Sequence, residues 1–402
     1  MQQAFEYIQT SLGGQYSPSE IRPVSFLLIE KLTGFSRTQI LADKSTIFSP
    51  EQRKELAGFV EKLKKNMPLQ YVLGETEFCG LIFKLNESVL IPRPETEELV
   101  EWICAENRAG RRLKILDIGT GSGCIAVALK HKIPDAAISA VDISDEALSA
   151  ARHNAEINKT DIHFSRQDIL QAYETPAKWD IIVSNPPYST QWAGNDNPLL
   201  INDLRFSPAG ILAPKSKADL AFVMHILAWL AINGTAAIVE FPGVLYRSGA
   251  EQKIRKYLID NNYIDCVIQL PANLFFGVSI ATCIIVLKQS KTDNTTLFID
   301  ASKESVHYGN KEKLTDKNID KILNAYIERN NKEYFTRLVP NAEIADNDYN
   351  IAVSSYVEQE DTREVIDIVQ LNAKIAEIVK RENELRQAID EIINDLEGDG
   401  YE

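Results

Sequence analysis

The stretch KILDIGTGSGCIAVALKH, residues 114–131, decides the fold of this 402-residue chain. An apolar run at residues 114–118 leads into a loop with three glycines, and a helical pattern of apolar residues follows at 124–131. A strand, a glycine-rich turn and a helix in this order form the first unit of a doubly wound parallel sheet. The expected fold class is therefore α/β, with a Rossmann-like sheet. Further strands are predicted at residues 137–141, 162–165, 179–184, 235–241, 264–270 and 281–287.

Acidic residues at the ends of these strands indicate a nucleoside-type ligand. Asp142 closes the second strand, where a carboxylate can bind both hydroxyls of a ribose, and Asp168 follows the third, placed to meet an adenine amino group. The loop has the spacing GxGxG after Asp117, whereas dinucleotide sites use GxGxxG to hold a pyrophosphate. The spacing favours S-adenosylmethionine, and with it the class I fold of S-adenosylmethionine-dependent methyltransferases. The predicted donor-binding residues are Asp117, Gly119, Thr120, Gly121, Ser122, Gly123, Asp142 and Asp168.

The predicted strand at 179–184 is followed by the tetrapeptide Asn185, Pro186, Pro187 and Tyr188, which we expect to be catalytic. A planar NH2 is a poor nucleophile because its lone pair is delocalised. The side-chain oxygen of Asn185, which also faces the donor, and a main-chain carbonyl can accept both N–H hydrogens. The prolines stiffen the loop, and the Tyr188 ring offers a stacking face. The alternative is a proline-rich turn without a catalytic role.

Composition places the chain among globular proteins. It is 45% hydrophobic and 25% charged, and no apolar run approaches the ~20 residues that cross a bilayer, so no membrane association is expected. Five scattered cysteines without a CxxC pair fit a reducing cytoplasm and argue against a metal site. We therefore predict a cytoplasmic protein without a bound metal.

The chain divides into five predicted segments. These are a helical domain at 1–75, a hairpin and connector at 76–110, the methyltransferase domain at 111–290, a mixed extension at 291–360 and a long helix at 361–402. Within residues 290–350 only one strand-like run is expected, at 296–299.

The last segment carries a heptad seam, with apolar residues three and four apart and one polar interruption at Glu382. An amphipathic helix of this kind can fold back on its own domain. We favour an intermolecular helix because the seam is long and its other faces are highly charged. The seam residues are Ile368, Leu371, Ile375, Ile378, Glu382, Leu385, Ile389, Ile392 and Leu396.

The net charge of −14 is unusual for a protein that grips nucleic acid unaided. Seventeen acids against five bases lie in residues 340–402, whereas residues 203–256 hold seven bases against four acids. The basic stretch is either a nucleic-acid contact or a solvated surface.

The first half of the chain resembles the release factor glutamine methyltransferases. The matching pieces are PLQYVLGETEF (68–78), LIPRPETEELV (90–100), LDIGTGSGCIAVAL (116–129), AVDISDEAL (140–148) and IIVSNPPY (181–188). The resemblance implies that the N-terminal helical domain docks a peptide chain release factor. It also implies that the glycine loop, Asp142 and residues near Asp168 and Leu170 bind the methyl donor, while the NPPY loop holds a glutamine amide.

The second half resembles the modification subunit of type I restriction-modification systems. The matching pieces are LAPKSKADLAFVMH (212–225), AAIVEFPGVLYRSGAEQKIRKYL (236–258), NLFFGVSIATCIIVLK (273–288) and NDYNIAVSSYVEQEDTREV (347–365), followed by the terminal seam. The resemblance implies methylation of the adenine amino group in duplex DNA. It also implies a complex with a specificity subunit, bound through residues 368–396.

The chain is therefore expected to be a hybrid joined at the NPPY loop. The segment that follows NPPY in the release-factor family is absent, and the longer helical domain of the type I family is replaced by the other kind. Three functions compete: an adenine-specific DNA methyltransferase, which we favour, a release factor glutamine methyltransferase, and a non-catalytic component that only binds a specificity subunit.

Overall fold

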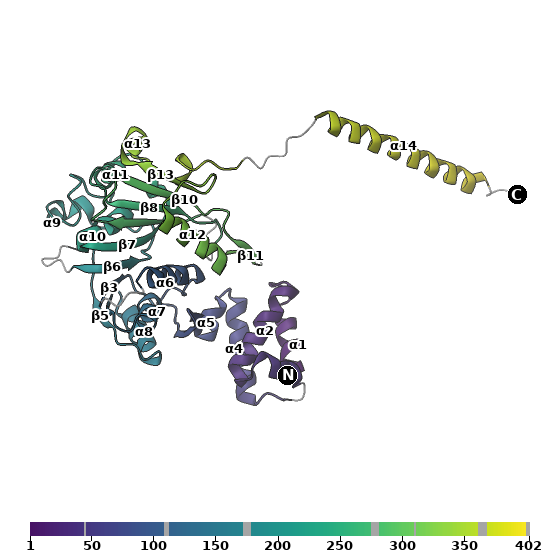
Figure 1. Ribbon diagram of the computed structural model, residues 1–402. Coiled ribbons are helices and arrows are strands. Elements are labelled where there is room, and N and C mark those ends of the chain that lie inside the picture. Colours follow the sequence, from purple (N-terminus) through teal and green to yellow (C-terminus); the bar gives the residue numbers. More distant parts are fainter. Residues whose placement is uncertain are drawn as a thin grey trace. The chain divides into compact units, whose positions relative to one another are not determined.

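The computed structural model describes residues 1–43, 46–107, 112–171, 178–274, 281–308, 311–360 and 368–398 (Figure 1). The predicted segment at 361–402 lies partly outside this description, as do residues 275–280 and 361–365 of the motifs quoted above. The chain divides into two units, one ending at Glu358 and one beginning at Gln359, of which residues 359–360 and 368–398 are described.

One mixed sheet runs through the larger unit, with the strand order β13-β10-β8-β9-β7-β6-β3-β4-β5. Strands β3, β4, β5, β6 and β7 are parallel to their neighbours in that series, and β9 is antiparallel to both β7 and β8. The α/β fold predicted from the sequence is confirmed. The bounds are β3 Lys114–Ile118, β4 Ala137–Asp142, β5 His163–Arg166, β6 Trp179–Ser184, β7 Leu230–Glu240, β8 Ile264–Gln269, β9 Cys283–Lys288, β10 Thr295–Asp300 and β13 Thr336–Pro340.

Helices cover both faces of this sheet and create two apolar cores. One core contains the apolar residues of α10 (Asp219–Trp229) and α11 (Ala250–Asp260). The other contains those of α6 (Pro94–Glu106), α7 (Cys124–Lys132) and α12 (Asp316–Glu328). Helix α8 (Asp145–Ile157) follows β4. Burial on both faces explains why β3 and β6 are nearly continuous apolar runs.

The sheet extends further than the sequence analysis expected. Strand β10, the one predicted run, pairs in parallel with β8, and β13 adds an antiparallel edge. Along the chain, β10 and β13 are separated by a hairpin of β11 (Val306–Tyr308) and β12 (Lys311–Lys313) and by helix α12. Short helix α13 (Asn341–Asp346) follows β13. The strands among these elements were missed because they are short and largely polar. Helix α12 was readable from the sequence, since Ile319, Ile322 and Tyr326 recur at helical spacing.

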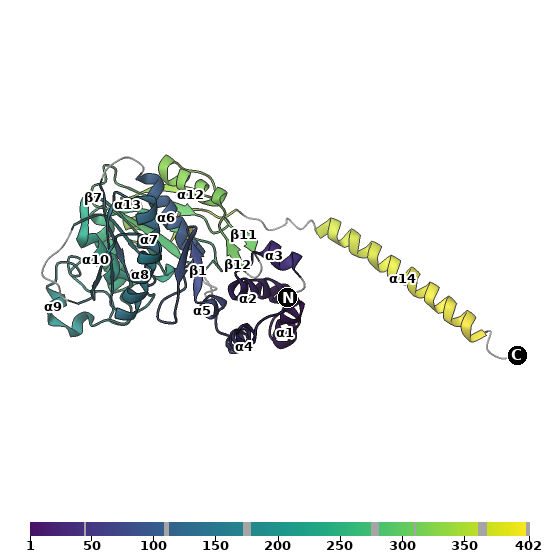
Figure 2. The ribbon, with the colours of Figure 1, turned by 90° about the horizontal axis from the view of Figure 1, so that it is seen from below.

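A helical bundle fills the N-terminal region (Figure 2). Helix α4 begins with Ser49 as its N-cap and Pro50 at the first turn. The bundle has its own apolar core, and an ion pair of 2.7 Å joins Lys31 of α2 to Glu75 of the following hairpin. The bounds are α1 Gln2–Leu12, α2 Pro18–Thr33, α3 Arg37–Ala42, α4 Pro50–Lys64, α5 Leu69–Leu73, and the hairpin strands β1 Glu75–Phe78 and β2 Leu81–Lys84.

The smaller unit is helix α14 (Ile368–Gly398), which matches the predicted heptad region. Its described seam residues are exposed, from 46% for Leu371 to 68% for Ile368. No helix in the described ranges combines the length and the apolar content that a bilayer span requires.

Candidate active site

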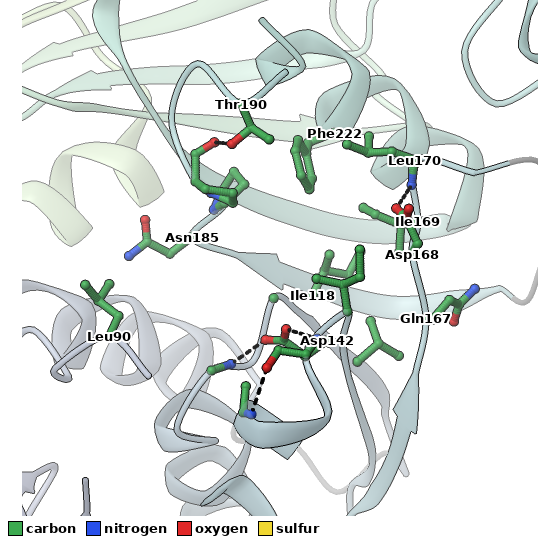
Figure 3. Close-up of a pocket in the computed structure, with 18 of the residues that line it drawn as sticks. Leu90, Ile118, Asp142, Gln167, Asp168, Ile169, Leu170, Asn185, Thr190 and Phe222 are labelled. Atoms are coloured by element: carbon green, nitrogen blue, oxygen red, sulfur yellow. Dashed lines mark hydrogen bonds between the residues drawn. The ribbon is translucent and has the colours of Figure 1, made fainter. Parts of the chain in front are cut away.

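A cavity of about 680 Å³ opens at the carboxyl ends of β3, β4 and β6 (Figure 3). Its wall combines the glycine loop with Asp142, Asp168, Leu170 and the loop that begins at Asn185. Figure 3 shows Asn185 and Leu90 toward one end of the pocket and Gln167, Asp168 and Leu170 toward the other. In a doubly wound sheet the carboxyl ends of the parallel strands lie along one edge, and such folds bind their ligands at that edge.

The glycine loop fixes the carboxylate of Asp142. The Gly121 N–H donates to Asp142 Oδ2 at 2.9 Å, and the Ser144 N–H donates to Oδ1 at 3.0 Å. Gly121 has a φ of 52°, a left-handed conformation that L side chains rarely adopt. At Gly123, with a φ of 79°, an added Cβ would lie 3.0 Å from Cβ of Ala151. The loop therefore needs glycine at these positions for its shape and for close helix packing.

Part of the predicted donor site lies behind the cavity wall. Gly119 and Gly121 line the cavity, but Asp117, Thr120, Ser122 and Gly123 do not. Thr120 Oγ1 donates to Asp117 Oδ2 at 2.6 Å, and complete burial raises the pKa of Asp117 to about 7. Asn154 Nδ2 donates to the carbonyl of Ser122 at 2.9 Å. These residues support the loop from within rather than facing a ligand.

The residues present fit S-adenosylmethionine. Asp142 offers an anchored acceptor for a ribose, and Asp168, whose Oδ1 accepts the Leu170 N–H at 3.0 Å, offers a second acceptor in the same cavity. Apolar side chains of Ile143, Ile169 and Leu170 supply walls for a flat ring.

The NPPY loop closes the other side of the cavity, and all four of its residues line it. Strand β6, which leads into this loop, is joined to β3 by Ser184 Oγ, which donates to the carbonyl of Ile118 at 2.9 Å. The Tyr188 hydroxyl donates to Asn185 Oδ1 over 3.4 Å, a long and therefore weak hydrogen bond. Burial, with a smaller contribution from Glu240, raises the pKa of Tyr188 above its ordinary value, so its hydroxyl remains a donor.

Several lining residues were missed by the sequence analysis. Leu90 and Arg93 come from the proline-rich connector before α6, and Trp192 follows the NPPY loop. Phe222 lies on α10, whose residues are apolar nearly all round, so no periodicity distinguished the one that faces the cavity. The connector's two prolines were the one available signal, since they mark a stiff segment.

Two of the three arginines in the basic stretch at 203–256 are buried, so neither interpretation holds for them. Arg205 is 5% exposed, and its guanidinium pairs with Asp203 at 2.6 Å. Arg255 is 1% exposed and donates to the carbonyls of Tyr349, Val244 and Arg247. Sequence counts could not reveal this, because the partners of Arg255 include a residue 94 positions away. Among the described residues, no group of His, Cys, Asp and Glu has the arrangement of a metal site.

Comparison with known proteins extends these observations. Residues 90–365 match the model of the N-6 DNA methylase family, and residues 3–74 match the PrmC N-terminal domain. The methylase subunit of the type I restriction enzyme MpnII from Mycoplasma pneumoniae is 47% identical over 222 residues, which are 55% of this chain and 41% of that protein. A release factor glutamine methyltransferase from Bacteroides thetaiotaomicron is 46% identical over 186 residues, 46% of this chain and 66% of that protein.

The matches to these curated relatives span 41% and 66% of their own lengths. A crystal structure of a type I restriction-modification methyltransferase subunit from Streptococcus thermophilus has a TM-score of 0.64 at 29% identity, covering 83% of this chain and 80% of that one. The class I methyltransferase fold and S-adenosylmethionine as the cofactor, both predicted from the sequence, are confirmed. The chain therefore belongs to the N-6 DNA methylase family, and it carries the N-terminal domain of the release factor glutamine methyltransferases in front of that family's residues.

Proposed function

We propose that the chain transfers a methyl group from S-adenosylmethionine to a planar NH2. The observation that carries this proposal is a single cavity lined by Asp142, Asp168 and Asn185, which joins a nucleoside-type site to a rigid polar loop. When bound, S-adenosylmethionine supplies a sulfonium-activated methyl group. Asp142 and Asp168 would hold its ribose and adenine, with the apolar residues beside Leu170 against the ring.

On the acceptor side, Asn185 Oδ1 and the carbonyl of Pro186 would accept the two N–H hydrogens of the target amine. The hydroxyl of Tyr188 donates weakly to the amide oxygen of Asn185, and its half-buried ring offers a stacking face. The nitrogen releases its proton after attack, to water or to a backbone acceptor. Most of the rate enhancement comes from alignment of the nitrogen, the methyl group and the sulfur, since the step requires no general base.

The favoured acceptor is the N-6 amino group of adenine in duplex DNA, rotated out of the helix into the cavity. The family match over residues 90–365 supports this choice, since it includes all of the cavity's acceptor side. The net charge of −14 disfavours unaided binding to phosphates, and the buried Arg205 and Arg255 are not available for phosphate contacts. A basic partner must then supply most of them.

That partner is a type I specificity subunit, bound through residues 368–396 of α14. The exposed seam supports this assignment, because a surface helix with isoleucines and leucines every three or four residues gains stability by burying them against another helix. Glu382 interrupts the seam, a feature that sets register in coiled coils.

A second acceptor, the side-chain amide of a release-factor glutamine, is favoured by one observation: residues 3–74 match a domain of the release factor methyltransferases. A glutamine amide presents the same planar NH2 to Asn185. A chain that only binds a specificity subunit is the third possibility, and the complete cavity argues against it.

Labelled S-adenosylmethionine offered with each acceptor distinguishes these functions. The full chain is incubated with duplex DNA plus a type I specificity subunit, and separately with a release factor. We expect label in DNA adenine. Label in release factor alone would assign the second function, and label in neither would assign the third.

A further inference from the structure

The NPPY loop continues into a residue with an unusual backbone. Ser189 has a φ of 53°, in the left-handed region that residues other than glycine, asparagine and aspartate seldom occupy. A conformation of this kind persists only where the surroundings impose it. Ser189 directly follows Tyr188, so its backbone sets the direction in which the catalytic loop leaves the cavity.

One side chain bonds directly to the main chain of Ser189. The Ser189 N–H donates to Oδ1 of Asp219 at 2.6 Å, a short bond of the charge-assisted kind. Asp219 is the first residue of α10 and only 1% exposed. Its other oxygen, Oδ2, has no hydrogen-bond partner among the described residues. The positive N-terminal end of the α10 dipole offsets part of the carboxylate's charge. The hydrogen bond that the carboxylate accepts comes from the Ser189 N–H in the loop.

The segment before α10 holds the same loop at further points. The Ala218 N–H donates to the carbonyl of Thr190 at 2.8 Å. The main-chain N–H and the ring N–H of Trp192 donate to the carbonyls of Lys215 and Pro214, each at 3.1 Å. In all three bonds the group contributed by residues 214–218 belongs to the main chain, so substitution of Asp219 leaves them in place. The Ser189 N–H bond differs from them because its acceptor is the Asp219 side chain, which a substitution can remove.

We propose that Asp219 is a positioning residue for methyl transfer, which fixes the NPPY loop through the Ser189 N–H and so aims Asn185 at the acceptor nitrogen. The inference rests on the proposed function for the transfer step, but its structural part does not. Asp219 is absent from the cavity wall, so it acts through the loop. Phe222, one turn further along α10, does line the cavity, which ties the same helix to both the loop and the site.

The matched substitutions are Asp219→Ala, which removes the acceptor, and Asp219→Asn, which keeps an oxygen acceptor without the charge. Amide hydrogen exchange of the peptide containing Ser189 is measured in the full chain. We expect Asp219→Ala to lose protection there and Asp219→Asn to retain it. Glu240→Gln, at another acid buried at the end of β7, serves as the control and should leave the Ser189 amide protected.

Turnover is then measured at saturating donor and acceptor. Asp219→Ala should lower kcat by about 10- to 100-fold with an unchanged dissociation constant for S-adenosylmethionine, as expected when a reacting group is slightly misplaced. Asp219→Asn should retain most of the wild-type kcat. Wild-type protection of Ser189 in Asp219→Ala would overturn the inference, and so would loss of protection or of turnover in a folded Asp219→Asn. An inactive wild-type chain would reject the proposed function alone, because the exchange measurement needs no acceptor.

Discussion

Single residues divide into those that face the cavity and those that shape it from behind. Asp142, Asp168 and Asn185 face it, whereas Asp117 and Asp219 are buried beneath its two loops. The two groups should respond differently to substitution. A residue that faces the cavity changes binding or turnover directly, whereas a buried residue acts through the loop that it supports. Substitution of Asp117 also changes the pH dependence of stability.

Asn185→Ala should reduce turnover at least ~100-fold while donor affinity changes little, because the lost interaction belongs to the acceptor. Exposed Asn233 lies on β7 outside the cavity lining, and Asn233→Ala is the matched control. Steady-state kinetics and calorimetry with S-adenosylmethionine provide the measurement. Undiminished turnover of Asn185→Ala would reject the assigned acceptor site.

Asp142→Ala should weaken S-adenosylmethionine by about 10- to 100-fold, which corresponds to the ~1.5–3 kcal/mol of hydrogen bonds to a charged group. Asp145→Ala is the control, since Asp145 is exposed and pairs with Arg166 at 3.2 Å. Calorimetric titration compares the two variants. Equal affinities in both would remove the ribose role of Asp142.

The buried carboxyl of Asp117 predicts a pH-dependent stability. Its pKa is raised from 3.8 to about 7 in the folded state, chiefly by burial. Between these values the folded chain holds a proton that the unfolded chain has released, so the free energy of unfolding falls as pH rises through this window. The loss approaches ~4 kcal/mol above pH ~7, at ~1.4 kcal/mol per pKa unit.

Urea unfolding of wild type and Asp117→Asn at pH 5 and pH 8 measures this effect. We compare the free energy of unfolding of Asp117→Asn with that of wild type at each pH. The difference should favour the variant more at pH 8 than at pH 5, because an amide cannot ionise. Glu240, whose pKa burial raises well above its ordinary value, adds to the same trend and remains in both proteins. A pH-independent difference between the two proteins would contradict the assignment.

At the scale of elements, α10 and α14 show opposite uses of an apolar helix. Helix α10 is buried nearly all round and holds both a cavity residue and the loop anchor. Helix α14 exposes its apolar seam and carries charge elsewhere. An apolar surface of that length is typical of an interface rather than of a free helix.

Ile389→Asp, in the middle of the seam, should weaken complex formation with a specificity subunit by at least ~10-fold, because a charge would be buried in a coiled-coil core. Glu391→Lys, off the seam, is the control. Size-exclusion chromatography with light scattering measures the complex. Methyl-donor affinity should be unchanged in both variants, and an intact complex with Ile389→Asp would refute the partner-binding role.

Across the whole molecule, the two halves of the hybrid share one sheet. Strands β6 and β7 lie on either side of the NPPY junction and pair in parallel, with Ile182 opposite Ala236 and Ser184 opposite Ile238. Ile182, Ala236 and Ile238 are all fully buried. The two apolar cores that flank the sheet also contain residues from both halves. The join therefore completes a continuous sheet instead of linking two separate domains.

Deletion of residues 1–74 separates the two candidate acceptors. If DNA is the acceptor, the shortened chain should retain adenine methylation within ~3-fold, because the N-terminal bundle has its own core. Release-factor methylation, if present, should be lost with its docking domain. Calorimetry with S-adenosylmethionine serves as the folding control. Loss of DNA methylation in a chain that still binds donor would contradict our choice of acceptor.

The sequence by itself determined the features that depend on nearby residues. The strand at Lys114–Ile118, the glycine loop and the strand before Asn185 follow from local periodicity and turn chemistry. The helix at Ile368–Gly398 follows from its heptads. The two family resemblances were also readable, because their motifs are contiguous.

Only the tertiary structure decided the features that depend on distant partners. It brought Asp219 to Ser189 across 30 positions, made Arg255 an internal donor and added β13 to the sheet edge. The physical reason is that a buried polar group or an edge strand is stabilised by whatever completes its hydrogen bonds. That partner is set by packing of the whole chain, and no local pattern encodes it.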